Sequence, residues 1–184
     1  MSDLERWKRE LREFLQNDEM VLRIPYPGPD LNPRRFWHAL AAQNPFRFAW
    51  QSFVVGITTV MPAGALKTGL LRSIGMKIGK DAFIASGVFF DVEFPMLVEI
   101  GDGVIIGTLT KVLTHDVTIQ TVRVGRVRIG KQAVIGAGCV IRSGVRIGEG
   151  AVVGMNSFIN RDVADRELCG GTPLQTIRML DKLI

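Results

Sequence analysis

Aliphatic residues recur at every sixth position through the second half of this chain. Small residues follow four positions later in each unit, so two columns share one period. The aliphatic column is Ile129, Ile135, Ile141, Ile147, Val153 and Ile159, and the small column is Ala133, Cys139, Val145, Ala151, Ser157 and Val163. A sustained repeat of this kind predicts a parallel β-helix, in which each unit buries its apolar face only on neighbouring units. If three units close one triangular coil, residues 18 positions apart stack on one another.

The same period begins earlier, near Met76, and is interrupted twice. Its early members are Ile78, Ile84, Phe90, Ile100, Ile106 and Val112. The ten-residue step across "DVEFP" predicts a bulging loop, and the polar segment "THDVTIQTVRVGR" predicts a second departure from the repeat. Irregular segments on a regular scaffold are where function usually lies, so we expect the site at one or both of them.

Glycine follows most residues of the aliphatic column, at positions 130, 136, 148 and 154. We expect these glycines to turn the corners of each coil with backbone conformations that a β-carbon would resist. Arg142 and Asn160 replace glycine 18 residues apart, and therefore fall on one edge. Nothing in the sequence explains Arg142.

The N-terminal part of the chain has helical periodicity instead. Residues 2–16 place Leu4, Trp7, Leu11 and Phe14 on one helical face, and Ser2 with Glu5 forms a capping box. A proline-rich stretch follows, and a second short helix is expected from Asn32 and Pro33 through "RRFWHALAA". We therefore divide the chain into a helical cap region, residues 1–75, and a β-helix domain, residues 76–184.

An uncharged segment at residues 48–66 is long enough to cross a bilayer. Its polar residues and glycines dilute its hydrophobicity, and Pro62 would break a helix near the end of the segment. Burial against the β-helix or a partner subunit fits this composition best. Weak contact with a membrane surface is the alternative.

Composition and charge narrow the classes of function. The 184 residues carry a formal net charge of +5 without a run of basic residues interleaved with aromatic ones, so nucleic acid is not the expected partner. The charged opening "MSDLERWKRE" does not read as a signal peptide, and Cys139 and Cys169 cannot form a CxxC site, so a cytoplasmic protein is expected. With only His38 and His115, one chain cannot build a three-histidine zinc site, and we predict no metal.

The tandem "IGKQAVIGAGCVIRSGVRIGEGAVVGMNSFINRDV" and the tail "CGGTPLQTIR" resemble the hexapeptide-repeat acyltransferases, especially the sugar O-acetyltransferases. The resemblance covers about residues 76–180. It implies an all-β fold class, a left-handed parallel β-helix, here with an N-terminal α-helical cap and a short C-terminal helix. It also implies a homotrimer with acetyl-CoA in the groove between adjacent subunits and a histidine of one subunit as the catalytic base.

His115, in "VLTHD", matches the place of that histidine just before the irregular segment. An alcohol or amine that attacks a thioester must lose its proton, and a neutral imidazole suits this task near pH 7. The alternative is a hydrogen-bonded surface histidine beside Asp116. For His38 we expect a packed or surface role.

The donor-binding candidates come from the repeat and from the tail. Arg128 and Arg146 should stack about 4.8 Å apart on one outer face, with Arg142 on the same face, where they could bind a CoA phosphate. A solvated face is the alternative. The resemblance adds Gly171 and Thr172 of "GGTP" at the CoA mouth and Arg178 as a substitute phosphate contact, and we include the corner glycines Gly136 and Gly154. Thr172 and Gln175 also predict a capping box, with Pro173 as the first residue of the C-terminal helix.

Asp91 and Glu93 on the first bulge are candidates to bind an acceptor hydroxyl, with simple loop solvation as the alternative. The outward pairs Val134 with Val152, and Val140 with Phe158, are apolar and should be covered by a neighbouring subunit or by the cap. The expected function is CoA-dependent acyl transfer to a hydroxyl of a sugar or related small molecule, with His115 as the base. The alternatives are N-acetyl transfer to an amino sugar and a non-catalytic β-helix scaffold.

Overall fold

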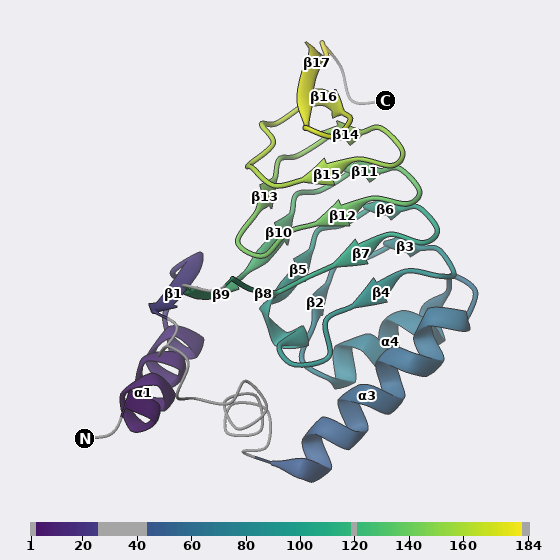
Figure 1. Ribbon diagram of the computed structural model, residues 1–184. Coiled ribbons are helices and arrows are strands. Elements are labelled where there is room, and N and C mark those ends of the chain that lie inside the picture. The colour runs from purple at the N-terminus through teal and green to yellow at the C-terminus, as the bar shows by residue number, and fades with distance from the viewer. Residues whose placement is uncertain (1–2, 26–43, 119–120, 182–184) are drawn as a thin grey trace.

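The computed structural model describes residues 3–25, 44–118 and 121–181. Its helices are α1 (Asp3–Gln16), α3 (Pro45–Val60) and α4 (Ala65–Ser73), with a 3-10 turn at Pro95–Leu97. Strand β1 (Val21–Pro25) follows α1, and the remaining strands begin after α4. Stacked coils rise from α3 and α4 at one end to the C-terminal hairpin at the other (Figure 1). The predicted second helix, His38 and the Ser2 cap lie outside the described residues.

The coils carry three parallel sheets, as the six-residue repeat predicts. Face 1 consists of β2 (Lys77–Ile78), β5 (Val98–Ile100), β10 (Val127–Ile129) and β13 (Arg146–Ile147). Face 2 consists of β3 (Phe83–Ile84), β6 (Ile105–Ile106), β11 (Val134–Ile135), β14 (Val152–Val153), β16 (Glu167–Gly170) and the antiparallel β17 (Gln175–Met179). Face 3 consists of β4 (Phe89–Phe90), β7 (Lys111–Val112), β12 (Val140–Ile141) and β15 (Phe158–Ile159). The predicted stacking is confirmed, because Ile129 pairs with Ile147 and Ile135 with Val153.

The aliphatic and small columns fill the interior, where Ile135, Ile141 and Cys139 are at most 1% exposed. The corner glycines have a different cause from the one expected. Gly136 does not have a positive φ, but a β-carbon there would lie 2.6 Å from the backbone nitrogen of Met155 in the next coil. Two residues later Gly138 does adopt a positive φ of 71°. Gly130, Gly136 and Gly148 are therefore required by close stacking of coils.

The second departure from the repeat forms a hairpin of β8 (His115–Val117) and β9 (Thr121–Gly125), and β1 adds a third antiparallel strand to it. The sequence pattern at residues 21–25 does not predict β1. A small second core lies between this sheet, α1 and the bulge loop, and it contains Trp7, Leu11, Phe14, Ile24, Phe94, Leu97, Val122 and Val124. The predicted N-terminal helix is thus confirmed, and it packs beside the hairpin.

Helices α3 and α4 cover the first coil of the β-helix. Val54, Val55 and Leu71 are at most 1% exposed and belong to the same core as the coils. The uncharged segment is broken near Pro62 as predicted, since α3 ends at Val60 and α4 begins at Ala65. Within the described residues, no helix has the length and apolarity needed to cross a membrane.

The predicted C-terminal helix is wrong. Residues 175–179 form β17, which pairs antiparallel with β16 at the edge of face 2. The unpaired backbone of β16 offers hydrogen bonds that a helix would leave unmade. All five residues of β17 are exposed in this hairpin.

Candidate active site

His115 lies where the chain leaves face 3 after β7 and enters β8. Its Nδ1 is 2.6 Å from Oδ2 of Asp91, which belongs to the bulge loop after β4. Asp91 is 2% exposed, and Oδ2 also accepts hydrogen bonds from the backbone nitrogens of Thr114 (2.9 Å) and His115 (3.1 Å). With Nδ1–H donating to this carboxylate, the neutral ring has Nε2 as its basic atom.

This pair shifts the pKa values of both partners. Burial works against the Asp91 carboxylate, but its hydrogen bonds to His115, Glu93 and Thr114 hold its pKa below the usual range. Burial also works against charge on His115, yet the hydrogen bond to Asp91 and the nearby carboxylates hold its pKa above the ordinary histidine value. His115 is therefore a stronger base than a solvated imidazole.

Glu93 completes the cluster, with Oε2 4.0 Å from Nδ1 of His115. Burial, and then the neighbouring Asp91, raise the pKa of Glu93 to about 7. The ring of Phe94 meets the His115 ring edge-on, with centroids 6.3 Å apart. The two predicted departures from the repeat, 24 residues apart in sequence, thus form one site.

Ligand atoms of Asp91, Glu93 and His115 lie within 4.8 Å of one another, a spacing that could hold a metal ion. Both Asp91 oxygens are already used as acceptors, because Oδ1 accepts the backbone nitrogen of Glu93 while Oδ2 binds the histidine segment. The arrangement therefore fits a hydrogen-bonded dyad better than a ligand set. Asp91 binds His115, which differs from the acceptor contact expected from its place on the bulge.

Arg142 holds the strand that carries His115. Its Nε and Nη2 donate to the two carboxylate oxygens of Asp116 at 3.1 and 3.0 Å, and Ser143 Oγ donates to Asp116 Oδ2 at 2.7 Å. Arg142 follows β12 on face 3, so the expectation that it shares a face with Arg128 and Arg146 is wrong. Arg142 replaces glycine in this column because its side chain binds Asp116 and so anchors the hairpin to the coil.

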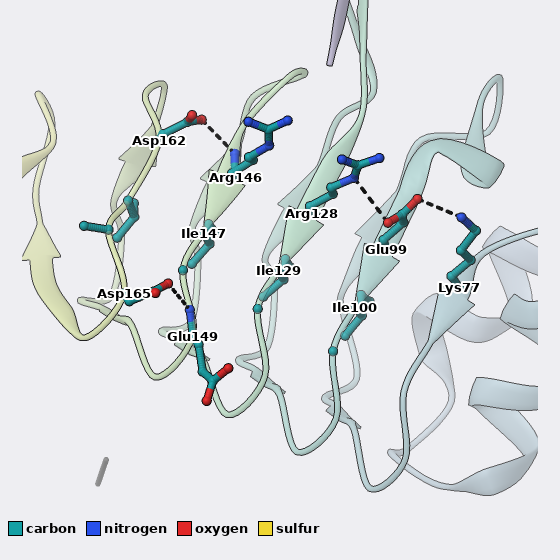
Figure 2. Close-up of a pocket in the computed structure, with 15 residues that line it drawn as sticks. Lys77, Glu99, Ile100, Arg128, Ile129, Arg146, Ile147, Glu149, Asp162 and Asp165 are labelled. Atoms are coloured by element: carbon teal, nitrogen blue, oxygen red, sulfur yellow. Dashed lines mark hydrogen bonds and ion pairs between the residues drawn. The ribbon is translucent and has the colours of Figure 1, made fainter. Parts of the chain in front are cut away.

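Arg128 and Arg146 do stack on face 1, in register on adjacent strands (Figure 2). They line an open groove of about 760 Å³. Arg128 forms ion pairs with two carboxylates, since its Nε lies 3.2 Å from Glu99 and its Nη2 contacts Asp18. Lys77 also pairs with Glu99, at 2.9 Å. Face 1 therefore carries three cations and one acid in a row, in the order Lys77, Glu99, Arg128 and Arg146, and Arg146 is the cation among them for which no ion pair is found among the described residues.

Gly136, Gly154, Gly171 and Thr172 gather at the corner between faces 2 and 3, where Phe158 N–H donates to the Gly171 carbonyl at 3.2 Å. Arg178 lies nearby on β17, opposite Leu168 of β16. His115 lies at the other edge of face 3, where the chain turns toward face 1. Within one chain, the candidate base His115 and these donor-binding candidates therefore lie at opposite edges of face 3.

The fold and the dyad define a β-helical protein of hexapeptide repeats with a buried aspartate supporting a histidine at one edge. The family described as "Bacterial transferase hexapeptide (six repeats)" matches residues 126–161. The chain is 34% identical over 142 residues to YvoF of Bacillus subtilis (strain 168), whose name gives it provisionally as an acetyltransferase. That match covers 77% of this chain and 83% of YvoF.

Two acetyltransferases are among the solved structures that share the fold. The hexapeptide-repeat acetyltransferase of Vibrio cholerae O1 biovar eltor, complexed with acetyl coenzyme A, matches with a TM-score of 0.65 and 25% identity over 77% of this chain and 91% of that one. A galactoside acetyltransferase in complex with coenzyme A matches with a TM-score of 0.60 and 17% identity over 74% and 82%. This chain belongs to the hexapeptide-repeat acyltransferases.

Proposed function

We propose that this protein is an acetyl-CoA-dependent O-acetyltransferase that acts on a hydroxyl of a sugar or a related small molecule, with His115 as general base. The 2.6 Å contact between Asp91 and His115 carries this proposal. A buried carboxylate that fixes the tautomer and raises the basicity of a histidine is the arrangement that proton removal from an alcohol requires.

The reaction is a direct transfer. Nε2 of His115 takes the proton of the acceptor hydroxyl as its oxygen bonds to the acetyl carbonyl carbon. The carbon–sulfur bond of the thioester then breaks, and the proton held by His115 passes to the thiolate of CoA. Asp91 stabilises the imidazolium that exists between these steps, and no covalent enzyme intermediate forms.

Acetyl-CoA is the proposed donor. The Vibrio cholerae structure is complexed with acetyl coenzyme A, and the galactoside acetyltransferase is complexed with coenzyme A. Arg146 and the corner formed by Gly136, Gly154, Gly171 and Thr172 are the proposed donor contacts, and Arg178 is a further phosphate contact. Glu93, with its carboxyl beside the dyad, is the proposed acceptor contact.

We further propose a homotrimer with the site between adjacent subunits. His115 and the glycine corner lie at opposite edges of face 3, so a site that uses both draws them from two chains. The outer surfaces of faces 2 and 3 support this assembly. Their outward apolar residues include Phe83, Ile105, Val134, Val152, Val140 and Phe158. The cytoplasmic location expected from the sequence stays a prediction.

The test is acetyl-CoA-dependent thiol release with a panel of sugars and amino sugars, on the wild type and on His115→Ala. We expect the wild type to release thiol with a hydroxyl acceptor and the variant to lose at least 100-fold in rate. Calorimetry should show that both proteins bind acetyl-CoA equally. Transfer by the variant at the wild-type rate would contradict the assignment of the base, and transfer to amino sugars alone would favour N-acetylation.

A further inference from the structure

Helix α3 has an apolar stripe that faces away from the β-helix. It consists of Phe46, Trp50, Phe53, Ile57 and Val60, whose side chains are 88%, 47%, 60%, 39% and 73% exposed. Leu66, in the first turn of α4, is also exposed. Scattered apolar residues on a surface need no explanation, but this many on one helix mark a binding surface.

The spacing of the α3 stripe alternates between four and three residues. At 3.6 residues per turn, the five side chains fall within an arc of roughly 80° along the whole helix. The packed face of α3 lies elsewhere, because Val54, Val55 and Thr58 are the residues buried against the first coil. The helix thus carries two apolar faces, and the fold buries only one of them.

The charge around the stripe indicates its partner. Residues 45–80 contain Arg47, Lys67, Arg72, Lys77 and Lys80 and not one acidic residue. Four of these cations are exposed, and Lys67 is buried, donating to the carbonyls of Met61 and Ala85. Lys77 is paired with Glu99 on face 1, which leaves Arg47, Arg72 and Lys80 as the other exposed cations of this segment. Exposed aromatic and aliphatic side chains on such a basic segment are complementary to anionic lipid head groups over acyl chains. Two copies of such a surface would repel each other.

We propose that α3 lies in the plane of an anionic membrane surface, with Phe46, Trp50 and Phe53 inserted at the head-group boundary. Trp50 and Phe53 are stacked, with ring centroids 5.9 Å apart, and so form a compact wedge. The helix rests on the membrane and does not cross it, in agreement with the absence of a spanning helix among the described residues. Docking would hold the α3 end of the β-helix against the membrane and leave the coils in water.

Flotation with lipid vesicles tests this proposal on the full chain. We expect the wild type to float with phosphatidylcholine vesicles containing 30% phosphatidylglycerol, and to do so at least 10-fold less with pure phosphatidylcholine. Trp50→Ser/Phe53→Ser should lower the partition coefficient at least 10-fold. The matched control is Ile177→Ser/Met179→Ser, which removes two equally exposed apolar residues at the far end of the molecule and should float like the wild type.

Trp50 is itself a reporter of insertion. In a Trp37→Phe background, vesicle binding should shift its fluorescence to the blue and make it accessible to brominated lipid. Both effects should be lost when Trp50→Phe is added, because Trp7 is buried. Binding of the Ser double variant equal to that of the wild type would overturn the proposal. So would a wild type that ignores anionic vesicles, or one whose mass without lipid falls on mutation of the stripe, since the stripe would then join copies of this chain.

Discussion

At the scale of single residues, Asp91 and His115 form a pair in which each changes the chemistry of the other. The carboxylate accepts hydrogen bonds from the histidine ring and from the backbone on both sides of the Thr114–His115 peptide bond. Ring position and basicity are therefore set by one side chain. Arg142 acts on His115 indirectly, because it binds Asp116, the next residue in the chain.

Replacing Asp91 by asparagine should lower kcat/KM at least 10-fold and change its pH dependence. Protonated His115 cannot act as a base, so activity falls as the pH drops through its pKa, which the wild type holds above the ordinary value. Loss of the Asp91 charge lowers that pKa, and the acidic limb of kcat/KM should move to lower pH. Asp181→Asn, at the far end of the β-helix, is the control, and an unmoved limb in Asp91→Asn would contradict the dyad.

The sequence located His115 but not its partner. The hexapeptide period shows where the repeat fails, and the family resemblance points to the histidine. The contact of Asp91 with His115 depends on two adjacent coils meeting, which local patterns do not encode. Asp91 could be read only as a polar residue on a bulge, and Arg142 only as a break in the glycine column.

At the scale of elements, two glycines of the same column, Gly136 and Gly154, have different surroundings in the stacked coils. Gly136 faces the backbone of the coil above, whereas a β-carbon at Gly154 would find its nearest atom, the Cys169 carbonyl oxygen, 3.6 Å away. Gly136→Ala must push two coils apart. Gly154→Ala fits in ordinary contact.

We therefore expect Gly136→Ala to lower the free energy of unfolding by about 1–3 kcal/mol. Gly154→Ala should change it by less than about 0.5 kcal/mol, because the loss of glycine's freedom in the unfolded chain offsets small contacts. Urea unfolding followed by circular dichroism measures both. Equal destabilisation by the two changes would refute the explanation by close stacking.

The C-terminal hairpin depends on a buried carboxylate in β16. Glu167 accepts from Arg161 Nη2 at 2.8 Å, Thr176 Oγ1 at 2.5 Å and the Ala164 backbone at 2.8 Å. The hydrogen bond from Arg161, opposed by burial and aided by Thr176, lowers the pKa of Glu167 to about 2. Ionised Glu167 thus ties β17 to the last coil.

This pKa predicts acid lability of the hairpin. Because the folded pKa lies below the unfolded value near 4.5, the stabilisation is complete above pH 4.5 and is lost as the pH falls toward 2. Glu167→Gln should cost about 2 kcal/mol at pH 7, and its difference from wild type should shrink below pH 4. Thermal unfolding across this range measures it, with exposed Glu149→Gln as the control. A difference independent of pH would rule out the ion pair as its cause.

Elements inside the repeat could be predicted from sequence, and those at its margins could not. The aliphatic and small columns share a six-residue period and so specify the coils, because residues that recur with this period all point into the interior of the β-helix. Strands β1 and β17 each pair with the edge of another element, so their conformation depends on a distant partner. The segment at 175–179 satisfied helix-start rules, yet the free edge of β16 determined its structure.

At the scale of the whole molecule, the distance between His115 and the glycine corner makes assembly part of the proposed chemistry. A chain with His115→Ala and a chain with Thr172→Arg should each be inactive alone. When they are co-expressed, interfaces that join an intact histidine to an intact corner should restore about a quarter of the activity or less, by random mixing. Sedimentation velocity should give one trimer mass throughout. No recovery in verified mixed oligomers would place the whole site in one chain.

The addition of β1 to the hairpin also bears on the order in which the chain folds. Coils of the β-helix join residues about 20 positions apart, whereas β1 and β9 are separated by about 100 residues. Contacts of such different range close at different times, because the entropy lost in closing a loop grows with its length. During synthesis β1 must wait, unpaired, until β9 has been made. The coil strands that precede β9 in the chain, β2 to β7, can therefore pair before the sheet that holds His115 is complete. The protein thus acquires part of its scaffold before the surroundings of His115 are in place.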